Sequence, residues 1–141
     1  MEKSTSELLE SLKSSRNYDE FLSKEVNELN FASLSEYLNI LIESKGIKKA
    51  DIILKSNLDK NYAYQIFNGT KNNPSRDKII MLAFGIGLNL EETSVLLKNA
   101  KHPDLYVRDP RDSIIIFCIS NSKSLIETNV LLDEHSLPIL E

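Results

Sequence analysis

One short pattern recurs along the chain and restricts what it can fold into: a Ser or Asn followed three residues later by Glu, beside an apolar run. At a helix start, the first side chain accepts a hydrogen bond from the third helical N–H, and the Glu side chain reaches back. The pattern therefore predicts helix starts at Ser4, Asn17, Ser33, Asn89 and Ser124. With apolar residues at helical spacing, the chain is predicted to be all-α, with helices near 4–14, 17–29, 33–44, 48–56, 59–68, 75–87, 89–100, 110–121 and 123–136.

The composition agrees with a compact helical protein. The chain has 141 residues, only four Gly and four Pro, and one cysteine, Cys118. A single cysteine excludes an internal disulfide framework and indicates a reducing compartment, so we expect a cytoplasmic protein. No apolar run reaches the roughly 18 residues that a membrane span needs, and no membrane association is expected.

An internal repeat indicates that the apolar run 114–119 is helical, although the run taken alone resembles a buried strand. Residues 76–103 align with 111–138 without a gap, at an offset of 35, and 11 of the 28 positions are identical. Because the first copy is predicted to be helical, the second should be as well. We therefore expect N-terminal amphipathic helices (1–32) lying against a central domain (33–102), and a C-terminal helical hairpin (103–141) that repeats 76–103. The connection is expected to pack through Leu105, Tyr106 and Val107.

Charge is distributed unevenly in this chain of net charge −4. Residues 45–78 hold eight basic and three acidic side chains. Residues 1–32 hold four basic and seven acidic side chains, and residues 103–141 hold three basic and seven acidic ones. Such a basic island is most simply a solvated lysine face. It becomes informative only where it coincides with a motif for DNA binding.

That motif lies within the basic island. A first helix (48–56) is expected to be anchored by the apolar side chains of Ile47, just before it, and of Ile52, Ile53 and Leu54. Asn57 stands where the chain must turn, Leu58 fills the turn, and Asp59 is a favourable helix N-cap. In the second helix (59–68), the inward side chains are predicted to be Ala63, Ile66 and Phe67, and one exposed flank is predicted to carry Lys60, Asn61, Tyr62 and Gln65. Tyr62 and Tyr64 are alternatively core or rim residues.

Residues 34–88 resemble the repressor-like helix-turn-helix domains of phage and bacterial regulators, known as the xenobiotic-response-element type. The resemblance is best over residues 45–83 and includes the ending Asn68-Gly69-x-Lys71-x-x-Pro74-Ser75. It implies a lambda-repressor-like five-helix domain that reads double-stranded DNA in the major groove with helix 59–68, generally as a homodimer on palindromic half-sites. Three positions depart from the family pattern: Lys49 replaces a usual Gln, Ile53 a small Ala, and Asn57 the turn Gly.

The resemblance also implies which side chains touch DNA. Base contacts would come from Lys60, Asn61, Tyr62 and Gln65, and phosphate contacts from Lys48, Lys49, Asn68, Lys71 and Asn72. The amides of Asn61 and Gln65 can pair with adenine N6/N7, and Lys60 can donate to guanine O6/N7.

Other functions find little support in the residues. His102 and His135 are isolated, Cys118 sits in an apolar run as an inert core residue, and no catalytic arrangement, cofactor motif or metal-ligand spacing is present. Arg111 recurs with Arg76 in the repeat, which favours a structural role. A second hypothesis remains: a helix-turn-helix-derived protein–protein module (an adaptor, an antitoxin or a phage-encoded inhibitor) whose acidic N- or C-terminal helices engage a protein. A homodimer is expected in the first hypothesis, through the apolar segments 114–119, 130–132 and 137–140.

Overall fold

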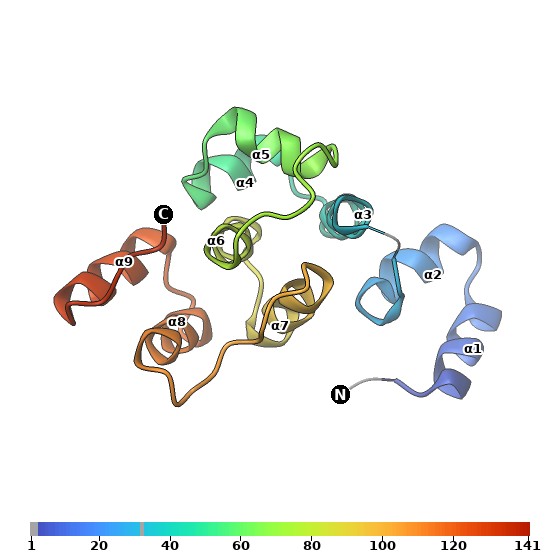
Figure 1. Cartoon of the computed structure of the whole chain (residues 1–141). Helices are drawn as coiled ribbons and strands as arrows, with labels where there is room; N and C mark the ends of the chain where they lie inside the picture. Colours follow the sequence, from blue (N-terminus) through green and yellow to red (C-terminus); the bar gives the residue numbers. More distant parts are fainter. Residues whose placement is uncertain (1–2, 32) are drawn as a thin grey trace.

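The computed structural model describes residues 3–31 and 33–141, and every regular element in this part of the chain is helical (Figure 1). The predicted all-α class is therefore confirmed, and each predicted helix is present. In chain order the elements are α1 (Thr5–Ser14), α2 (Tyr18–Lys24), the 3-10 helix η1 (Val26–Glu28), α3 (Leu34–Lys45), α4 (Lys49–Ser56), α5 (Lys60–Phe67), α6 (Arg76–Ile86), α7 (Leu90–Asn99), α8 (Pro110–Ser120) and α9 (Leu125–Glu134). No helix within these ranges is both long enough and apolar enough to cross a membrane.

The predicted caps form at the helix starts. The Asn89 side chain accepts a hydrogen bond from the Glu92 N–H at 2.8 Å, and the Glu92 carboxylate accepts one from the Asn89 N–H at 3.0 Å. The same pair of hydrogen bonds caps the start of α1 and of α9. At the starts of α2 and α3, the side chains of Asn17 and Ser33 accept the hydrogen bond from the third helical N–H. Each cap satisfies N–H groups that have no partner within the helix, so the helix starts follow from the local sequence.

The predicted helix 17–29 is wrong in its second half. The α-helix stops at Lys24 and only one turn of 3-10 helix follows, over Val26–Glu28. Between them the backbone of Glu25 leaves the helical conformation, and its side chain is only 2% exposed and forms an ion pair with Lys3. The interrupted helix allows the Glu25 carboxylate to reach Lys3 and the Val26 side chain to enter the core.

Of the two N-terminal helices, the second makes the more extensive contact with the central domain. Helix α2 packs on α3, and Phe21 is buried. Helix α1 buries none of its residues, and Leu9 and Leu12 remain 48% and 41% exposed. Figure 1 shows α1 at the edge of the molecule, beside α2.

Helix α6 is the centre of the fold. Seven of its eleven residues are buried, and α4, α7 and α9 contact it from different sides (Figure 1). The closest of these packings is the crossing with α4. A Cβ atom placed at Gly85 would lie 2.6 Å from the carbonyl oxygen of Ile52 and 2.8 Å from the Cβ of Ser56. Glycine at this position therefore allows the two backbones to approach.

The repeat is visible in the backbone. Residues in the left-handed conformation recur at the offset of 35, at Gly87 and Ser122 and again at Lys101 and Ser136. The run 114–119 lies inside α8, so its helical interpretation is confirmed. Helix α6 contacts α9, and α7 contacts α8. The first helix of each hairpin thus contacts the second helix of the other hairpin, as expected if a local two-fold axis relates the two hairpins.

The connection between the two hairpins packs less than predicted. Leu105 is partly buried against the core, but Tyr106 and Val107 are 58% and 68% exposed. The connection is fixed through its backbone instead, because the N–H of Tyr106 donates to the carboxylate of Asp112 at 3.0 Å. The side chains of Tyr106 and Val107 therefore remain exposed.

Candidate nucleic-acid interface

Helices α4 and α5 are joined by a tight turn of the predicted kind. Asn57 ends α4 in the left-handed conformation, with φ 55° and ψ 22°. Leu58 is buried beneath the turn. The carboxylate of Asp59 then accepts a hydrogen bond from the Tyr62 N–H at 3.0 Å, which starts α5. The predicted roles of these three residues are confirmed.

Helix α5 has a buried face and an outer face. Ala63, Ile66 and Phe67 are at most 2% exposed, as predicted. On the other side, Lys60 and Asn61 are exposed and Gln65 is half-buried. These three polar side chains therefore share the outer part of a helix whose inner part is fixed by the core.

Tyr62 is half-buried, which fits the alternative prediction of a core or rim residue better than a place on the exposed flank. A helix turns by about 100° per residue, which carries Tyr62 past Asn61 toward α6. There its ring is half-buried against the core, and the amino group of Lys78 lies 5.8 Å from the ring centroid. Tyr64, one turn after Lys60, is instead 38% exposed. The i, i+4 spacing from Lys60 is the sequence signal that places Tyr64 on the outside.

The anchoring of α4 also differs from prediction at one position. Ile52 is fully buried and Ile53 is partly buried, but Leu54 is 81% exposed. A short helix that packs mainly on one neighbour, α6, has only one buried stripe, and Leu54 lies outside it.

The predicted phosphate-binding residues lie at the start of α4 and directly after α5. Lys48 is exposed at the start of α4, and Lys71 and Asn72 are exposed in the loop after α5. Lys49 is half-buried, with its amino group 5.5 Å from the centroid of the Phe67 ring. The side-chain oxygen of Asn68 accepts a hydrogen bond from the Thr70 N–H at 2.9 Å.

Backbone and side-chain hydrogen bonds hold the end of α5 and its following loop. The N–H of Lys71 donates to the carbonyl of Gln65 at 2.9 Å, which folds the loop back on α5. The side-chain amide of Asn39, in α3, donates to the carbonyl of Phe67 at 2.7 Å. Sequence reasoning missed Asn39. The available signal was a polar residue beside the apolar stripe of that helix, which is formed by Leu34, Tyr37, Leu38, Leu41 and Ile42.

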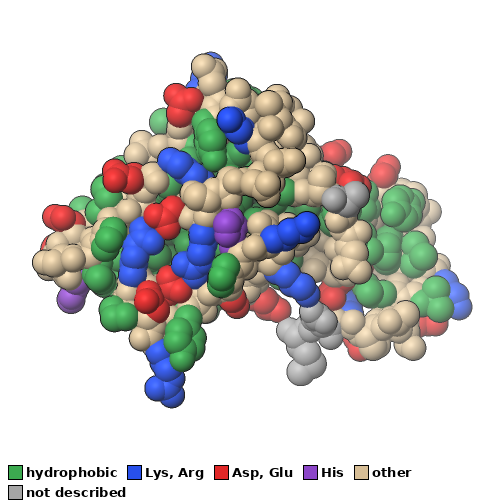
Figure 2. All heavy atoms as spheres, viewed as in Figure 1, with side chains coloured by type: hydrophobic (Ala, Val, Ile, Leu, Met, Phe, Trp, Pro, Cys, Tyr) green, Lys and Arg blue, Asp and Glu red, His purple; other side chains and the backbone are tan. Residues whose placement is uncertain are grey.

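The structure divides the basic island into two groups. Lys45 pairs with Glu92 at 2.7 Å and Arg76 pairs with Asp112 at 2.8 Å, so these two cations hold the fold together. The other six show no ion pair within the described ranges: Lys48, Lys49, Lys55, Lys60, Lys71 and Lys78. Figure 2 shows basic and acidic side chains mixed on the viewed face rather than one continuous basic patch.

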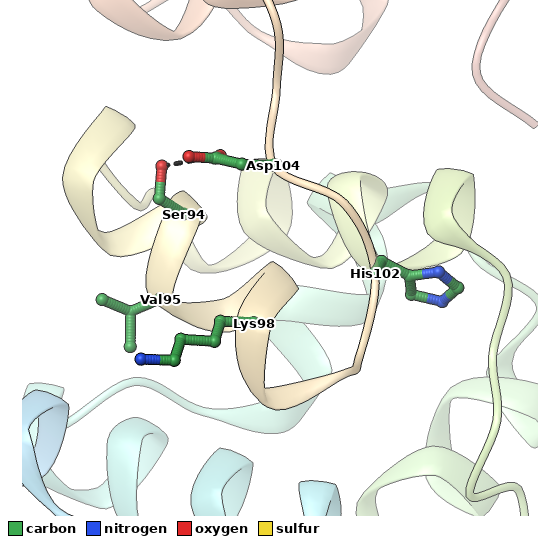
Figure 3. A pocket seen from close by; sticks show the side chains of 5 residues that line it. All are labelled: Ser94, Val95, Lys98, His102 and Asp104. Carbon is green, nitrogen blue, oxygen red and sulfur yellow. Dashed lines mark hydrogen bonds between the residues drawn. The ribbon is translucent and has the colours of Figure 1, made fainter.

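A separate shallow cavity of about 440 Å³ beside α7 holds no catalytic arrangement (Figure 3). It is lined by Ser94, Val95, Lys98, His102 and Asp104. The Ser94 hydroxyl donates to the Asp104 carboxylate at 2.8 Å, and the His102 ring turns away toward the carbonyl of Pro74, also at 2.8 Å. Among the described residues, no group of three or more His, Cys, Asp and Glu side chains could hold a metal ion.

Comparisons with protein-family models, with curated proteins and with solved structures found no match to this chain.

Proposed function

We propose that this protein is a sequence-specific double-stranded DNA-binding transcriptional regulator of the repressor-like type. In this proposal α3 to α7 form a lambda-repressor-like five-helix domain, and α5 enters the major groove. One observation carries the proposal. Lys60, Asn61 and Gln65 share the outer face of a short helix that Asp59 caps at its start and Asn39 holds at its end.

These side chains have the chemistry needed to read base edges. The amides of Asn61 and Gln65 each carry a donor and an acceptor, which match N6 and N7 of adenine. The Lys60 ammonium is a donor for O6 and N7 of guanine. Each well-formed pair discriminates against the wrong base by about 1–3 kcal/mol.

Phosphate contacts would hold the protein in register. Lys48 and Lys49 lie at the start of α4, and Asn68, Lys71 and Asn72 lie in the loop after α5. Three lysine–phosphate contacts would release about three counterions, which predicts a slope of about −3 in a plot of log affinity against log salt concentration. Because the chain has a net charge of −4, binding by one protomer should be weak. A homodimer on two half-sites about 34–36 Å apart would increase the affinity.

Selection from randomised duplexes, followed by fluorescence anisotropy across a range of salt concentrations, tests the proposal. We expect an enriched site whose affinity falls steeply with salt and is reduced about tenfold or more by Lys60→Ala or Gln65→Ala. The matched control is Lys13→Ala, an exposed lysine on α1, which should leave affinity unchanged. Failure to bind any duplex, or binding that ignores both sequence and salt, would exclude a DNA-reading role.

A second candidate function is a protein–protein interaction module derived from the helix-turn-helix fold: an adaptor, an antitoxin or a phage-encoded inhibitor. Its specific support is Leu54, which is 81% exposed on α4, together with Tyr64 on α5. Exposed apolar side chains of this kind suit a protein partner better than a phosphate backbone. If folded protein bound no duplex in the experiment above, this candidate would replace the first.

A further inference from the structure

Helix α9 presents an unusual exposed stripe. Ile126 and Val130, one turn apart, are 74% and 53% exposed. Lys123 precedes these two residues, and its amino group lies 3.8 Å from the carboxylate of Glu127 in the first turn of the helix. Asp133 follows them near the end of the helix. Lys123 and Asp133 are both exposed. The stripe therefore consists of a cation, two apolar side chains and a carboxylate, in that order.

The repeat shows that this surface differs from its counterpart. On α7 the equivalent positions of Ile126 and Val130 are Glu91 and Val95. They line a groove of about 850 Å³ whose other residues include Lys3, Leu8 and Glu25 of the N-terminal segment. The first copy thus has part of the chain facing it. On α9 the position of Glu91 is occupied by isoleucine, although none of the described residues covers it.

We propose that a second copy of this chain covers the stripe, with the two α9 helices antiparallel about a two-fold axis. The stripe is complementary to itself in this arrangement. Positions 126 and 130 are equally far from position 128, and so are positions 123 and 133. An axis that crosses α9 at the level of residue 128 therefore places each Ile126 against Val130 of the second copy. It also brings Lys123, which precedes the first residue of α9, toward Asp133 near the end of the second copy's helix. Such an isologous contact forms every interaction twice.

The charges favour an antiparallel second copy over a parallel one. The opposite charges at the two ends of the stripe meet only in the antiparallel arrangement, whereas a parallel partner would bring like charges together. In Figure 1, α9 lies at the left edge of the molecule and α5 at the upper edge, so the proposed contact through α9 does not involve α5. The ten residues of α9 span about 15 Å. The contact is therefore small, and the dimer should be weak and concentration-dependent.

This interface replaces most of the dimer surface predicted from the sequence. Within the predicted segments, Ile115, Cys118, Leu132 and Leu140 are buried inside a single chain. Their apolar character is explained by the fold of the protomer. Val130 is the one residue of those segments that the proposed interface retains.

The inference goes beyond DNA binding and is tested without DNA, by sedimentation velocity of the full chain from about 1 to about 200 µM. We expect the weight-average mass to rise from 16.0 kDa toward twice that value. Ile126→Glu or Val130→Glu should abolish the rise, with circular dichroism confirming that each variant folds. The matched control is Phe117→Ser, which removes a 54% exposed apolar side chain from α8 and should leave the rise unchanged.

A charge exchange makes the test specific to the antiparallel pairing. Lys123→Glu and Asp133→Lys should each weaken dimerisation at least about fivefold, and the double variant should restore it to within about twofold of the parent. Simple loss of stability would not be rescued in this way. A mass of 16.0 kDa at every concentration, a dimer lost in Phe117→Ser but kept in Ile126→Glu, or failure of the double variant to recover would each overturn the proposal.

Discussion

Arg76 and Asp112 join the two copies of the repeat through a two-pronged ion pair. The guanidinium of Arg76 donates to the two carboxylate oxygens of Asp112 at 3.0 Å and 2.8 Å. Arg111 of the second copy forms the same fork with Asp77 of the first copy, at 2.9 Å for both bonds. Each arginine also donates to two backbone carbonyls that follow its own hairpin, Arg76 to those of residues 103 and 104 and Arg111 to those of residues 138 and 139. The expected structural role of Arg111 is confirmed, and Arg76 has the same role.

Replacing the first of these arginines by lysine should destabilise the protein. An ammonium cannot reproduce the planar fork, so Arg76→Lys leaves acceptors on Asp112 and on the connection without donors. We expect the free energy of unfolding to fall by about 1–3 kcal/mol in urea denaturation followed by circular dichroism. Arg108→Lys, an exposed position in the connection, is the control and should change it by less than about 0.5 kcal/mol. Equal unfolding midpoints for the two variants would contradict the role of the fork.

The same ion pair should make stability depend on pH in the acid range. Burial raises the pKa of Asp112, but hydrogen bonds from Arg76 and from the Tyr106 N–H lower this pKa by more, so it lies below its ordinary value. A carboxylate with a lowered folded-state pKa stabilises the fold fully above the unfolded pKa of about 3.9 and loses that contribution as pH falls through the folded value.

Thermal melting between about pH 2 and pH 7 measures this contribution. Asp112→Asn should melt lower than the parent at neutral pH, and the difference should shrink toward the acid end. Asp51→Asn, an exposed carboxylate on α4, serves as the control and should follow the parent curve. A constant difference across the whole range would show that the charge of Asp112 is not what stabilises the fold.

The crossing of α4 and α6 should be intolerant of a side chain at Gly85. A methyl group there would meet the Ile52 carbonyl oxygen at 2.6 Å, which is backbone and cannot rotate away. Gly85→Ala should therefore lower the free energy of unfolding by about 1–3 kcal/mol, despite the better helix propensity of alanine. Ser120→Ala is the control, because residue 120 is the exposed repeat counterpart of Gly85. If both substitutions stabilised the protein in urea denaturation, the close approach would be refuted.

Two variants should separate positioning contacts from reading contacts on DNA. Lys71→Ala removes one proposed phosphate contact from each protomer, so affinity should fall to a similar extent for all sequences and the salt slope should become less steep by about 1 for each protomer bound. Gln65→Ala removes a proposed base contact, so preference for one base pair should relax by about 1–3 kcal/mol with the salt slope unchanged. Anisotropy titrations with the selected site and with single-base variants measure both effects. The reverse pattern would reassign the two residues.

Sequence alone determined where the helices begin. Caps, the left-handed Asn57 and the apolar spacing act within about four residues, so their physics is contained in short stretches of the chain. The repeat carried the correct assignment into 114–119, where propensity favoured a strand. The buried face of α5 followed for the same reason, since Ala63, Ile66 and Phe67 lie on one side of any helix at that position.

Tertiary structure alone decided which neighbour each face meets. Leu54 is exposed because α4 packs mainly on one helix, and Tyr62 is covered because α6 and Lys78 happen to lie beside it. Glu25 interrupts a helix to reach Lys3, 22 residues away. Arg76 meets a carboxylate 36 residues further along the chain, which removes it from the basic island. Such pairings depend on how the helices are placed in space, and no local pattern of residues encodes that placement.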